Sequence, residues 1–276
     1  MGLVRRPSPF TLARSKDPER PLVVEVPHAG LAIPDDVRAQ LCVGRADVLR
    51  DADLFVDELC AGAVSRGASL LVSHVSRYVV DLNRAEDDID RDVVPDHPRP
   101  RPLQSRGVVW RTTTTGQPAL TAPLTYAQLE QRLARYHRPY HAALEAEVER
   151  KRRMFGWVLV VCAHSMPSVT RPGSPRRADV VPGSRGGSTT SPRVLDVVDA
   201  QLRAAGLSVR HDDPYKGGFT TQKLGRPREG VHAVQIEINR ALYVEERTSE
   251  PDERGFARVT QALDALLAEL SRLDLR

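Results

Sequence analysis

Two imidazoles and one carboxylate stand in short apolar stretches of the sequence, where strands of a buried sheet are expected. His28 and His164 each close such a stretch, and Glu237 lies within a third. In open α/β sheets, ligands bind in the crevice outside the carboxyl ends of the strands. Imidazole and carboxylate hold a catalytic zinc ion, and a further carboxylate takes a proton from its water. The three residues therefore point to a mononuclear zinc hydrolase.

Each of these side chains also has a purely structural interpretation. Either histidine can be a core or turn residue that is hydrogen-bonded to backbone. Glu237 shares one face of its stretch with Gln235 and Asn239, as on a solvent-facing edge strand. The repetition of histidine at two strand ends favours the metal site.

A third ligand is expected from the acidic residues that follow the first strand. Asp51, Asp53 and Asp57 lie in a segment whose apolar residues have roughly helical spacing. On a helix, Asp53 and Asp57 share a face, whereas Asp51 points elsewhere. Acidic residues also stabilise the first turn of a helix without binding anything. The spacing leaves all three candidates open.

Basic residues around the next extended segment suggest an acidic substrate. Arg77, Asn83 and Arg84 are grouped there, and guanidinium groups capture carboxylates with two parallel hydrogen bonds. Ion pairs with Asp81 or Glu86 are the structural alternative.

The elements that must carry these residues alternate along the chain. Strands are expected at 22–26, 69–75, 158–164 and 231–239, with shorter extended segments at 78–82 and 207–210. Helices are expected at 46–65, 125–153, 194–205 and 255–273, the second of them opened by Thr125 and interrupted near Pro139. Strand, helix and strand in this order indicate a βαβ unit with parallel strands.

Three segments between these elements read as loops, at 87–123, 166–187 and 212–228. They are rich in turn-forming and charged residues. Long loops in compact domains are often functional lids or disordered linkers. We expect the segment 166–187 to lie over the site.

Bulk composition predicts one soluble domain. The 276 residues are 41% hydrophobic, which suffices for a single domain over 1–276, with 1–20 as a flexible N-terminal extension. Cys42, Cys60 and Cys162 lack C-x-x-C spacing, which argues against disulfides and thiolate zinc sites and favours a reducing compartment. Without a signal peptide or an apolar run of about 20 residues, a cytoplasmic protein is expected, with no membrane partner.

Seven segments, taken together and in order, resemble the N-formylglutamate amidohydrolase family. They begin at Val26-Pro27-His28-Ala29-Gly30 and end with Val231-His232-Ala233-Val234-Gln235-Ile236-Glu237-Ile238-Asn239. Between them lie matching segments at 51–59, 76–84, 162–167, 179–183 and 213–219. As a set the matches are specific, although each alone is weak.

The resemblance implies an α/β fold of the phosphorylase/hydrolase-like type, with three α/β/α layers around a mixed central sheet, related to zinc carboxypeptidases. It implies hydrolysis of N-formyl-L-glutamate to formate and L-glutamate in histidine degradation. A related zinc hydrolase of another N-acyl amino acid or a small peptide is the alternative. The expected substrate partner is a small acidic N-acyl amino acid, and the expected assembly is a monomer or small homo-oligomer.

Carried over by position, the resemblance also implies site residues. The metal ligands would be His28, Asp53 and His164, with Glu237 as the general base. The cofactor would be Zn²⁺, with another divalent metal as the alternative. Contacts to the substrate carboxylates would come from Arg77, Asn83, Arg84, Arg185 and Lys216.

Three rival functions have weaker support. A serine hydrolase based on Ser165 lacks the G-x-S-x-G turn, and Ser165 directly follows His164 in the chain. Nucleic-acid binding is not demanded by a net charge of +4, and the basic runs at 151–153 and 176–177 are short, without interleaved aromatic residues. A metal-free binding protein would have no use for both histidines together with Glu237.

Overall fold

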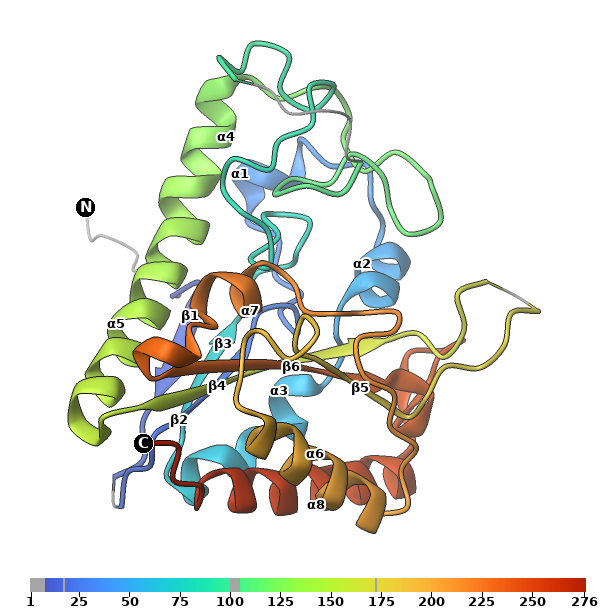
Figure 1. Cartoon of the computed structure of the whole chain (residues 1–276). Helices are drawn as coiled ribbons and strands as arrows, with labels where there is room; N and C mark the ends of the chain where they lie inside the picture. The colour runs from blue at the N-terminus through green and yellow to red at the C-terminus, as the bar shows by residue number, and fades with distance from the viewer. Residues whose placement is uncertain (1–7, 17, 100–104, 172) are drawn as a thin grey trace.

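A six-stranded mixed sheet forms the centre of the molecule (Figure 1). The computed structural model describes residues 8–16, 18–99, 105–171 and 173–276. The strand order is β1-β3-β2-β4-β6-β5, in which β1 and β5 run antiparallel to their neighbours and the four inner strands run parallel. The strands are β1 (Phe10–Ala13), β2 (Leu22–Val26), β3 (Ser69–Ser73), β4 (Val158–Met166), β5 (Val180–Gly183) and β6 (Val231–Asn239).

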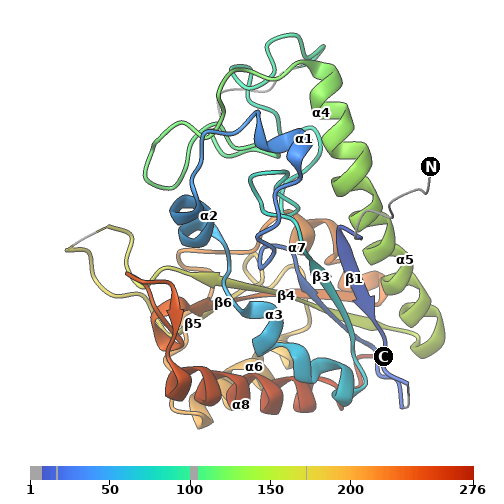
Figure 2. The same cartoon turned by 180° about the vertical axis from the view of Figure 1, so that it is seen from behind.

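Helices cover both faces of the sheet, so the chain has three layers (Figures 1 and 2). One face carries α3 (Val56–Leu59), the 3-10 helix Ala61–Arg66, α6 (Pro192–Ala204) and α8 (Glu253–Leu270). The other carries α4 (Tyr126–Arg132), the π-helical turn Leu133–His137, α5 (Arg138–Phe155) and α7 (Phe219–Leu224). Shorter elements are α1 (Asp35–Arg38), α2 (Arg45–Asp51), the 3-10 helices Pro227–Glu229 and Arg240–Leu242, and the small hairpin of β7 (Val244–Glu245) and β8 (Glu250–Pro251).

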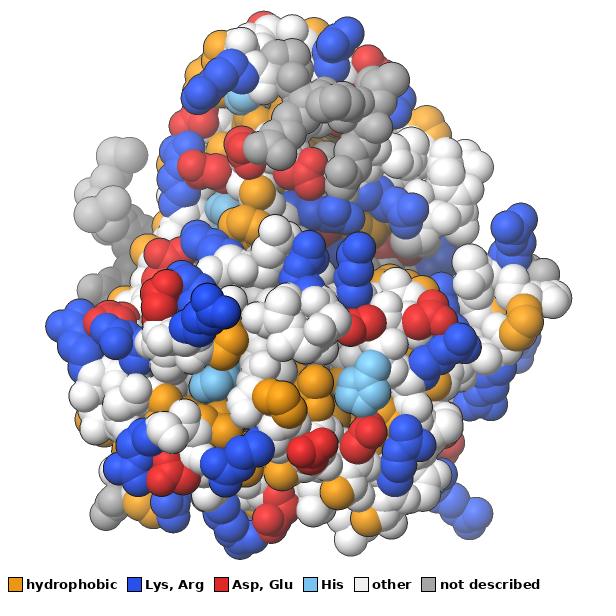
Figure 3. Space-filling model, in the orientation of Figure 1, with side chains coloured by type: hydrophobic (Ala, Val, Ile, Leu, Met, Phe, Trp, Pro, Cys, Tyr) orange, Lys and Arg blue, Asp and Glu red, His pale blue; other side chains and the backbone are white. Residues whose placement is uncertain are grey.

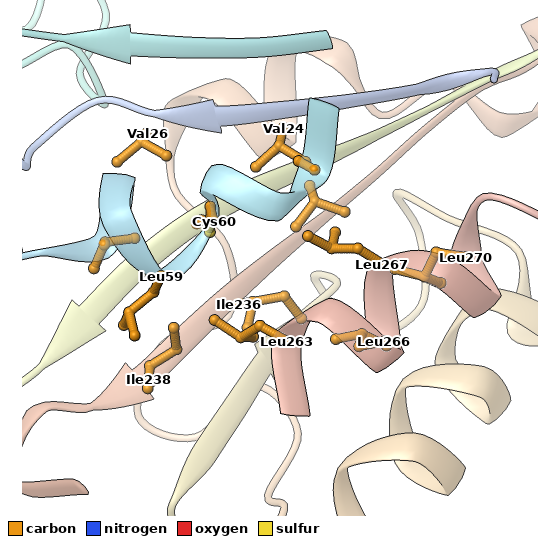
Figure 4. Packing of buried hydrophobic residues seen from close by; sticks show 14 of the residues in the cluster. Val24, Val26, Leu59, Cys60, Ile236, Ile238, Leu263, Leu266, Leu267 and Leu270 are labelled. Carbon is orange, nitrogen blue, oxygen red and sulfur yellow. The ribbon is translucent and has the colours of Figure 1, made fainter. Parts of the chain in front are cut away.

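Alternation along the strands separates two apolar cores. Val24, Val26 and Ile236 point to the α3, α6 and α8 layer, where they pack with residues such as Leu59 and Leu263 (Figure 4). Val23, Val160 and Ala233 belong to the second core, on the α4 and α5 side. The mixed sheet and the three layers confirm the fold class expected from the sequence.

The long segment 87–123 has no regular helix or strand in its described residues, as expected, but it is packed. Ile89, Val93, Val108 and Trp110 are buried and join the core beneath α4. Residues 100–104 lie outside the described part of the chain. Most of this segment is therefore a structured cap over one side of the sheet.

The helix expected over 46–65 is wrong as one element. It ends with α2 at Asp51, resumes as α3 at Val56, and continues as the 3-10 helix from Ala61. Phe55 lies in the left-handed region at φ 60°, which no α-helix passes through. The interruption puts Asp53 in a loop.

The extended segment expected at 78–82 is a series of turns and belongs to no strand. Its carbonyls bind side chains of the long helix instead: Arg132 donates to the carbonyls of Tyr78 and Val79, and His141 to that of Leu82. Carbonyl groups that accept from side chains in this way are not free to form a ladder of hydrogen bonds with a neighbouring strand.

Further elements differ from expectation or decide between alternatives. β5 is a strand within the segment 166–187, and α7 is a helix within the turn-rich segment 212–228. The segment 207–210 makes only a single bridge, between Val209 and Val180. β6 pairs with β4 and β5 and is buried along its length, so it is not a solvent-facing edge strand.

The N-terminal segment requires a correction as well. Phe10–Ala13 lie inside the extension expected to be flexible, yet they form β1, which pairs with β3. Residues 1–7 and 17 are outside the described part of the chain.

The long helix follows its sequence signals closely. Thr125 caps α4 by accepting from the backbone of Gln128, whose side chain accepts from the Thr125 backbone in return. The expected interruption near Pro139 is a π-helical turn at Leu133–His137. Proline lacks a backbone N–H, so a change of hydrogen-bond pattern one turn before it costs little. α6 and α8 also lie where the sequence predicts them.

The surface carries both signs of charge. Lys and Arg side chains are interspersed with Asp and Glu over the face seen in Figure 3. Within the residues that the structure describes, no helix combines the length and the apolar character that crossing a bilayer requires.

Candidate active site

His28, Asp53 and His164 converge although they come from distant parts of the chain. One ligand atom from each lies within 4.8 Å of the others, and all three residues are buried. Asp53 Oδ2 is 2.9 Å from His164 Nδ1 and 3.4 Å from His28 Nδ1. Two imidazole nitrogens and one carboxylate oxygen therefore face a common point, at the carboxyl ends of β2 and β4.

Local backbone contacts fix this convergence. The backbone N–H of Asp53 donates to the carbonyl of His28 at 3.0 Å, which ties the α2–α3 loop to the end of β2. Tyr243 donates its hydroxyl to the carbonyl of Leu54 and holds the same loop from the other side. Gly30 allows the turn after His28, since a Cβ there would lie 2.3 Å from the backbone of His74.

The orientation of His28 is set by Asp81. His28 Nε2 lies 2.8 Å from Asp81 Oδ1, and an ionised carboxylate only accepts hydrogen bonds. Nε2 therefore carries a hydrogen, and in the neutral ring Nδ1 then has a free lone pair. His28 Nδ1 is buried without a hydrogen-bond partner in the structure, as expected of a metal-binding atom.

Asp81, which is expected from the sequence only as an ion-pair partner, is the centre of a buried network. Arg77 and the indole N–H of Trp110 each donate to its Oδ2 at 2.9 Å, and the backbone of Asn83 donates to Oδ1. Burial raises the pKa of Asp81, but Arg77 and His28 outweigh it and hold that pKa well below its usual range. The carboxylate is ionised at neutral pH.

Electrostatics at the site favour a cation. Burial lowers the pKa of His164, yet the carboxylates of Asp53, Glu237 and Glu25 more than compensate, so that this pKa is raised. The field that stabilises an imidazolium also stabilises a metal ion. With the free lone pair of His28 Nδ1, the donor set of two imidazoles and one carboxylate fits zinc with an open coordination position.

Glu237 stands beside His164 on the next strand. The two residues are register partners in the parallel pair of β4 and β6, and Glu237 is buried. Burial raises the pKa of Glu237, and the Asp53 carboxylate adds to the effect. Gln235 donates from Nε2 to Glu237 Oε1 at 2.8 Å and accepts from the backbone of Gly218 at 2.8 Å. Gln235 thereby connects the carboxylate of Glu237 to the loop before α7.

Arg77 and Asn83, two of the five predicted substrate contacts, are engaged with protein groups at the site. Arg77 forms the ion pair with Asp81 that was the structural alternative, and its guanidinium stacks 4.4 Å from the Trp110 ring centroid. Asn83 accepts from the backbone of Thr220 at 3.1 Å, and its Nδ2 lies 3.2 Å from His164 Nε2. Both residues line the metal-binding group rather than open solvent.

Of the other three, Arg185 is also engaged with a protein group, because its guanidinium donates to the carbonyl of Gly217 at 3.0 Å. Arg84 lies 3.7 Å from Asp88, with 38% of its side chain exposed. Arg185 donates its backbone N–H to the carbonyl of Lys216, so these two residues lie together although they are far apart in sequence. The loop that carries Lys216 adjoins the site, because the backbone N–H of Gly218 donates to Gln235, whose side chain donates to Glu237.

The alternative acidic ligands have other roles or lie elsewhere. Asp51 is buried and accepts from the Tyr78 hydroxyl and from the backbone of Thr114. Asp57 is half-buried on α3 and does not belong to the His28 group found among the described residues.

Residues that suggested a serine hydrolase or a nucleic-acid-binding protein have structural roles instead. Ser165 Oγ accepts from the buried Arg240 at 3.4 Å, and no hydrogen bond to an imidazole base is found in the described structure. Lys151, from the basic run 151–153, is buried and donates to the carbonyl of Arg20. It therefore holds backbone together and is unavailable to a nucleic acid.

Comparison with known proteins gives consistent results. The family model for N-formylglutamate amidohydrolase matches residues 20–244. N-formylglutamate deformylase of Pseudomonas putida is 32% identical over 90% of this chain and 92% of its own, and that of Pseudomonas aeruginosa is 33% identical over 90% and 93%. The crystal structure of N-formylglutamate amidohydrolase from Ralstonia eutropha JMP134 superimposes with a TM-score of 0.87 at 36% identity, covering 96% of this chain and 97% of that one.

Proposed function

The chain belongs to the N-formylglutamate amidohydrolase family, and on this premise we propose that it hydrolyses N-formyl-L-glutamate to formate and L-glutamate. We propose further that a zinc ion is held by His28, Asp53 and His164, and that the reaction serves histidine degradation. The observation that carries the metal assignment is the buried, unpartnered Nδ1 of His28 facing Asp53 and His164.

When bound, a divalent cation polarises the amide carbonyl and brings the pKa of a water molecule down to about 7. Glu237 is the proposed base that takes the proton from the attacking water. Its raised pKa suits this role, because a carboxylate is a more effective base when its pKa approaches neutral pH. Glu237 then returns the proton to the nitrogen of the leaving L-glutamate.

The substrate carries two carboxylates, which require cationic partners. We assign this role to Arg84, Arg185 and Lys216, whose charges lie on segments around the site. Arg77 and Asn83 are the remaining proposed substrate contacts. They would bind the substrate while keeping their contacts with Asp81 and His164. Binding at both ends aligns the formyl group with Glu237, and such positioning is a large part of the catalytic effect.

The test is release of formate by the purified protein, before and after removal of metal by a chelator, and after return of zinc. N-formyl-L-glutamate is compared with N-formyl-L-aspartate, N-acetyl-L-glutamate and a glutamyl dipeptide. We expect chelated protein and Glu237→Gln each to lose at least about 100-fold in kcat, and the Gln variant to retain its metal. Equal turnover of all four substrates, or full activity in the chelated protein, would refute the proposal.

We also propose a cytoplasmic enzyme that is a monomer or a small homo-oligomer. Cys42, Cys60 and Cys162 are free thiols in the structure, which suits a reducing compartment. Cell fractionation and light scattering of the purified protein test both statements.

A further inference from the structure

Two histidines of the long helix hold the backbone on either side of Asn83. His137 Nε2 lies 2.9 Å from the carbonyl oxygen of Arg84, and His141 Nε2 lies 2.9 Å from that of Leu82. Carbonyl oxygens only accept, so both Nε2 atoms carry a hydrogen. One helix thus donates two hydrogen bonds, one turn apart, to the residues before and after Asn83.

Burial keeps this pair neutral. Desolvation lowers the pKa of His137, and desolvation together with the neighbouring His137 lowers that of His141 to about 3. The two rings lie with their centroids 4.3 Å apart. Neither imidazole reaches bulk solvent to act in acid-base chemistry at neutral pH, and neither contacts the proposed metal ligands.

The same pair touches α7, whose N-terminus binds the Asn83 side chain. The ring of Phe219 lies 5.4 Å from that of His141 and 6.4 Å from that of His137, measured between centroids. The next residue, Thr220, donates its backbone N–H to Asn83 Oδ1. Lys223 of α7 also pairs with Glu145 of α5, so the two helices are linked beyond the ring contacts (Figure 1).

The helix departs from regular geometry at this place. The π-helical turn Leu133–His137 ends at the first of the two histidines, and π-helical turns occur frequently at functional sites. Pro139 lies between the histidines and removes one backbone donor. The geometry of the helix therefore changes at the point where His137 and His141 reach the Asn83 backbone.

We propose that His137 and His141 are positioning residues, which hold the Leu82–Arg84 backbone so that Asn83 and Arg84 are placed to bind the substrate. This inference rests on the proposed function, in which Asn83 and Arg84 contact the substrate. The histidines act through two neutral hydrogen bonds and touch neither the substrate nor the reacting atoms. Their effect is therefore expected on substrate affinity and not on the chemical step.

The experiment replaces each histidine by Met, which removes the donor, and by Gln, which has similar length and keeps an N–H. His137→Met and His141→Met are expected to raise KM for N-formyl-L-glutamate about tenfold each, because one net hydrogen bond corresponds to about that factor. We expect kcat to stay within about threefold and the zinc content to stay unchanged. The Gln variants are expected to recover most of the wild-type KM.

His232→Met is the matched control. His232 is also buried and also bonds to backbone, accepting from Ser191, but it lies near the opposite end of β6 from Glu237. The KM of the His232→Met variant is expected to equal that of the wild type. Should a Met variant not fold, the Phe variant of the same histidine replaces it with the same expectation.

Amide hydrogen exchange of the 82–84 segment supplies a readout that needs no turnover. We expect faster exchange in the Met variants and near wild-type exchange in the Gln variants. An unchanged KM and unchanged exchange in folded Met variants would overturn the inference, as would equal impairment in the Met and Gln variants. Absence of activity in the wild type would defeat the proposed function instead, and the exchange measurement would still decide the role of the histidines.

Discussion

Glu237 and His164 are register partners on adjacent parallel strands, so the proposed base and a proposed metal ligand are fixed side by side by the hydrogen bonds of the sheet. Neither position depends on a loop. A site built on central strands is held more rigidly than one built on loops, and rigid placement is what proton transfer during attack requires.

Asp81→Asn should weaken metal binding while leaving the fold intact. The amide has only one accepting oxygen, so it cannot accept from Arg77 and Trp110 on one side and from His28 on the other as the carboxylate does. Loss of such an outer partner typically lowers metal affinity by about 10- to 100-fold. Competition with a chromophoric chelator measures it. Asp90→Asn removes a buried carboxylate bound to Arg111 and should leave metal affinity unchanged.

Gln235→Met should reduce kcat through the orientation of Glu237. The variant keeps the side-chain volume but removes the N–H that donates to Glu237 Oε1 and the oxygen that accepts from Gly218. A hydrogen bond to a charged group contributes about 1.5–3 kcal/mol, so a loss of about 10- to 100-fold is expected. Steady-state kinetics on protein of verified metal content measures it. Wild-type kcat in this variant would mean that Glu237 is oriented without Gln235.

Gly218→Ala should impair substrate binding. A Cβ at this position would lie 2.3 Å from Asn83 Nδ2, closer than real contacts allow, so Asn83 or the loop before α7 must shift. We expect a higher KM with little change in thermal stability. Gly44→Ala serves as the control, because the nearest atom to its Cβ is an Asp47 oxygen at 3.7 Å. A crystal structure of the variant would show which group has moved.

Glu147 should make the protein sensitive to acid. Burial raises its pKa, but hydrogen bonds from Arg150, Ser69 and Arg14 outweigh this and lower the pKa to about 2, from 4.5 as the ordinary value. Because the folded state binds the proton more weakly than the unfolded chain, the stabilisation is complete above about pH 4.5 and is lost as the pH falls towards 2.

The contribution of Glu147 amounts to at most about 3 kcal/mol at neutral pH. Chemical denaturation at a series of pH values measures it, and Glu147→Gln should flatten the profile between pH 4.5 and 2. A variant profile parallel to that of the wild type would assign the acid sensitivity to other groups.

The sequence was informative where apolar periodicity decided the structure. β2, β4, β6 and α8 are long or strongly apolar, and their existence followed from their patterns. Burial of such runs outweighs local preferences, so the fold class could be inferred. The proposed ligands His28 and His164 were found because each closes such a run.

The sequence was misleading where tertiary contacts decided. Residues 78–82 have the composition of a strand, but Arg132 and His141 of a distant helix bind their carbonyls. β5 was missed because it is only four residues long and contains Pro182 and Gly183. Both cases depend on residues far away in the sequence, which a local pattern does not contain.

The choice among the three aspartates illustrates the same limit. Helical spacing paired Asp53 with Asp57, whereas the left-handed backbone of Phe55 separates them and the Asp53 amide binds the His28 carbonyl. Asp81 and Gln235 lie in the segments 76–84 and 231–239, which resemble the family. Their importance is visible only from the hydrogen bonds that they make in the folded protein. A carboxylate two residues before Asn83 and an amide two residues before Glu237 were the signals available.

The strand order has a consequence for the biogenesis of the protein. His164 follows Asp53 by 111 residues and lies on β4, which must pair with both β2 and β6 before the sheet is whole. When only His28 and Asp53 of the three proposed ligands have been translated, the nascent chain still lacks the central strand β4. The proposed metal-binding group would therefore be complete only after β4 has been translated, and a polypeptide terminated before His164 would lack one of its three members.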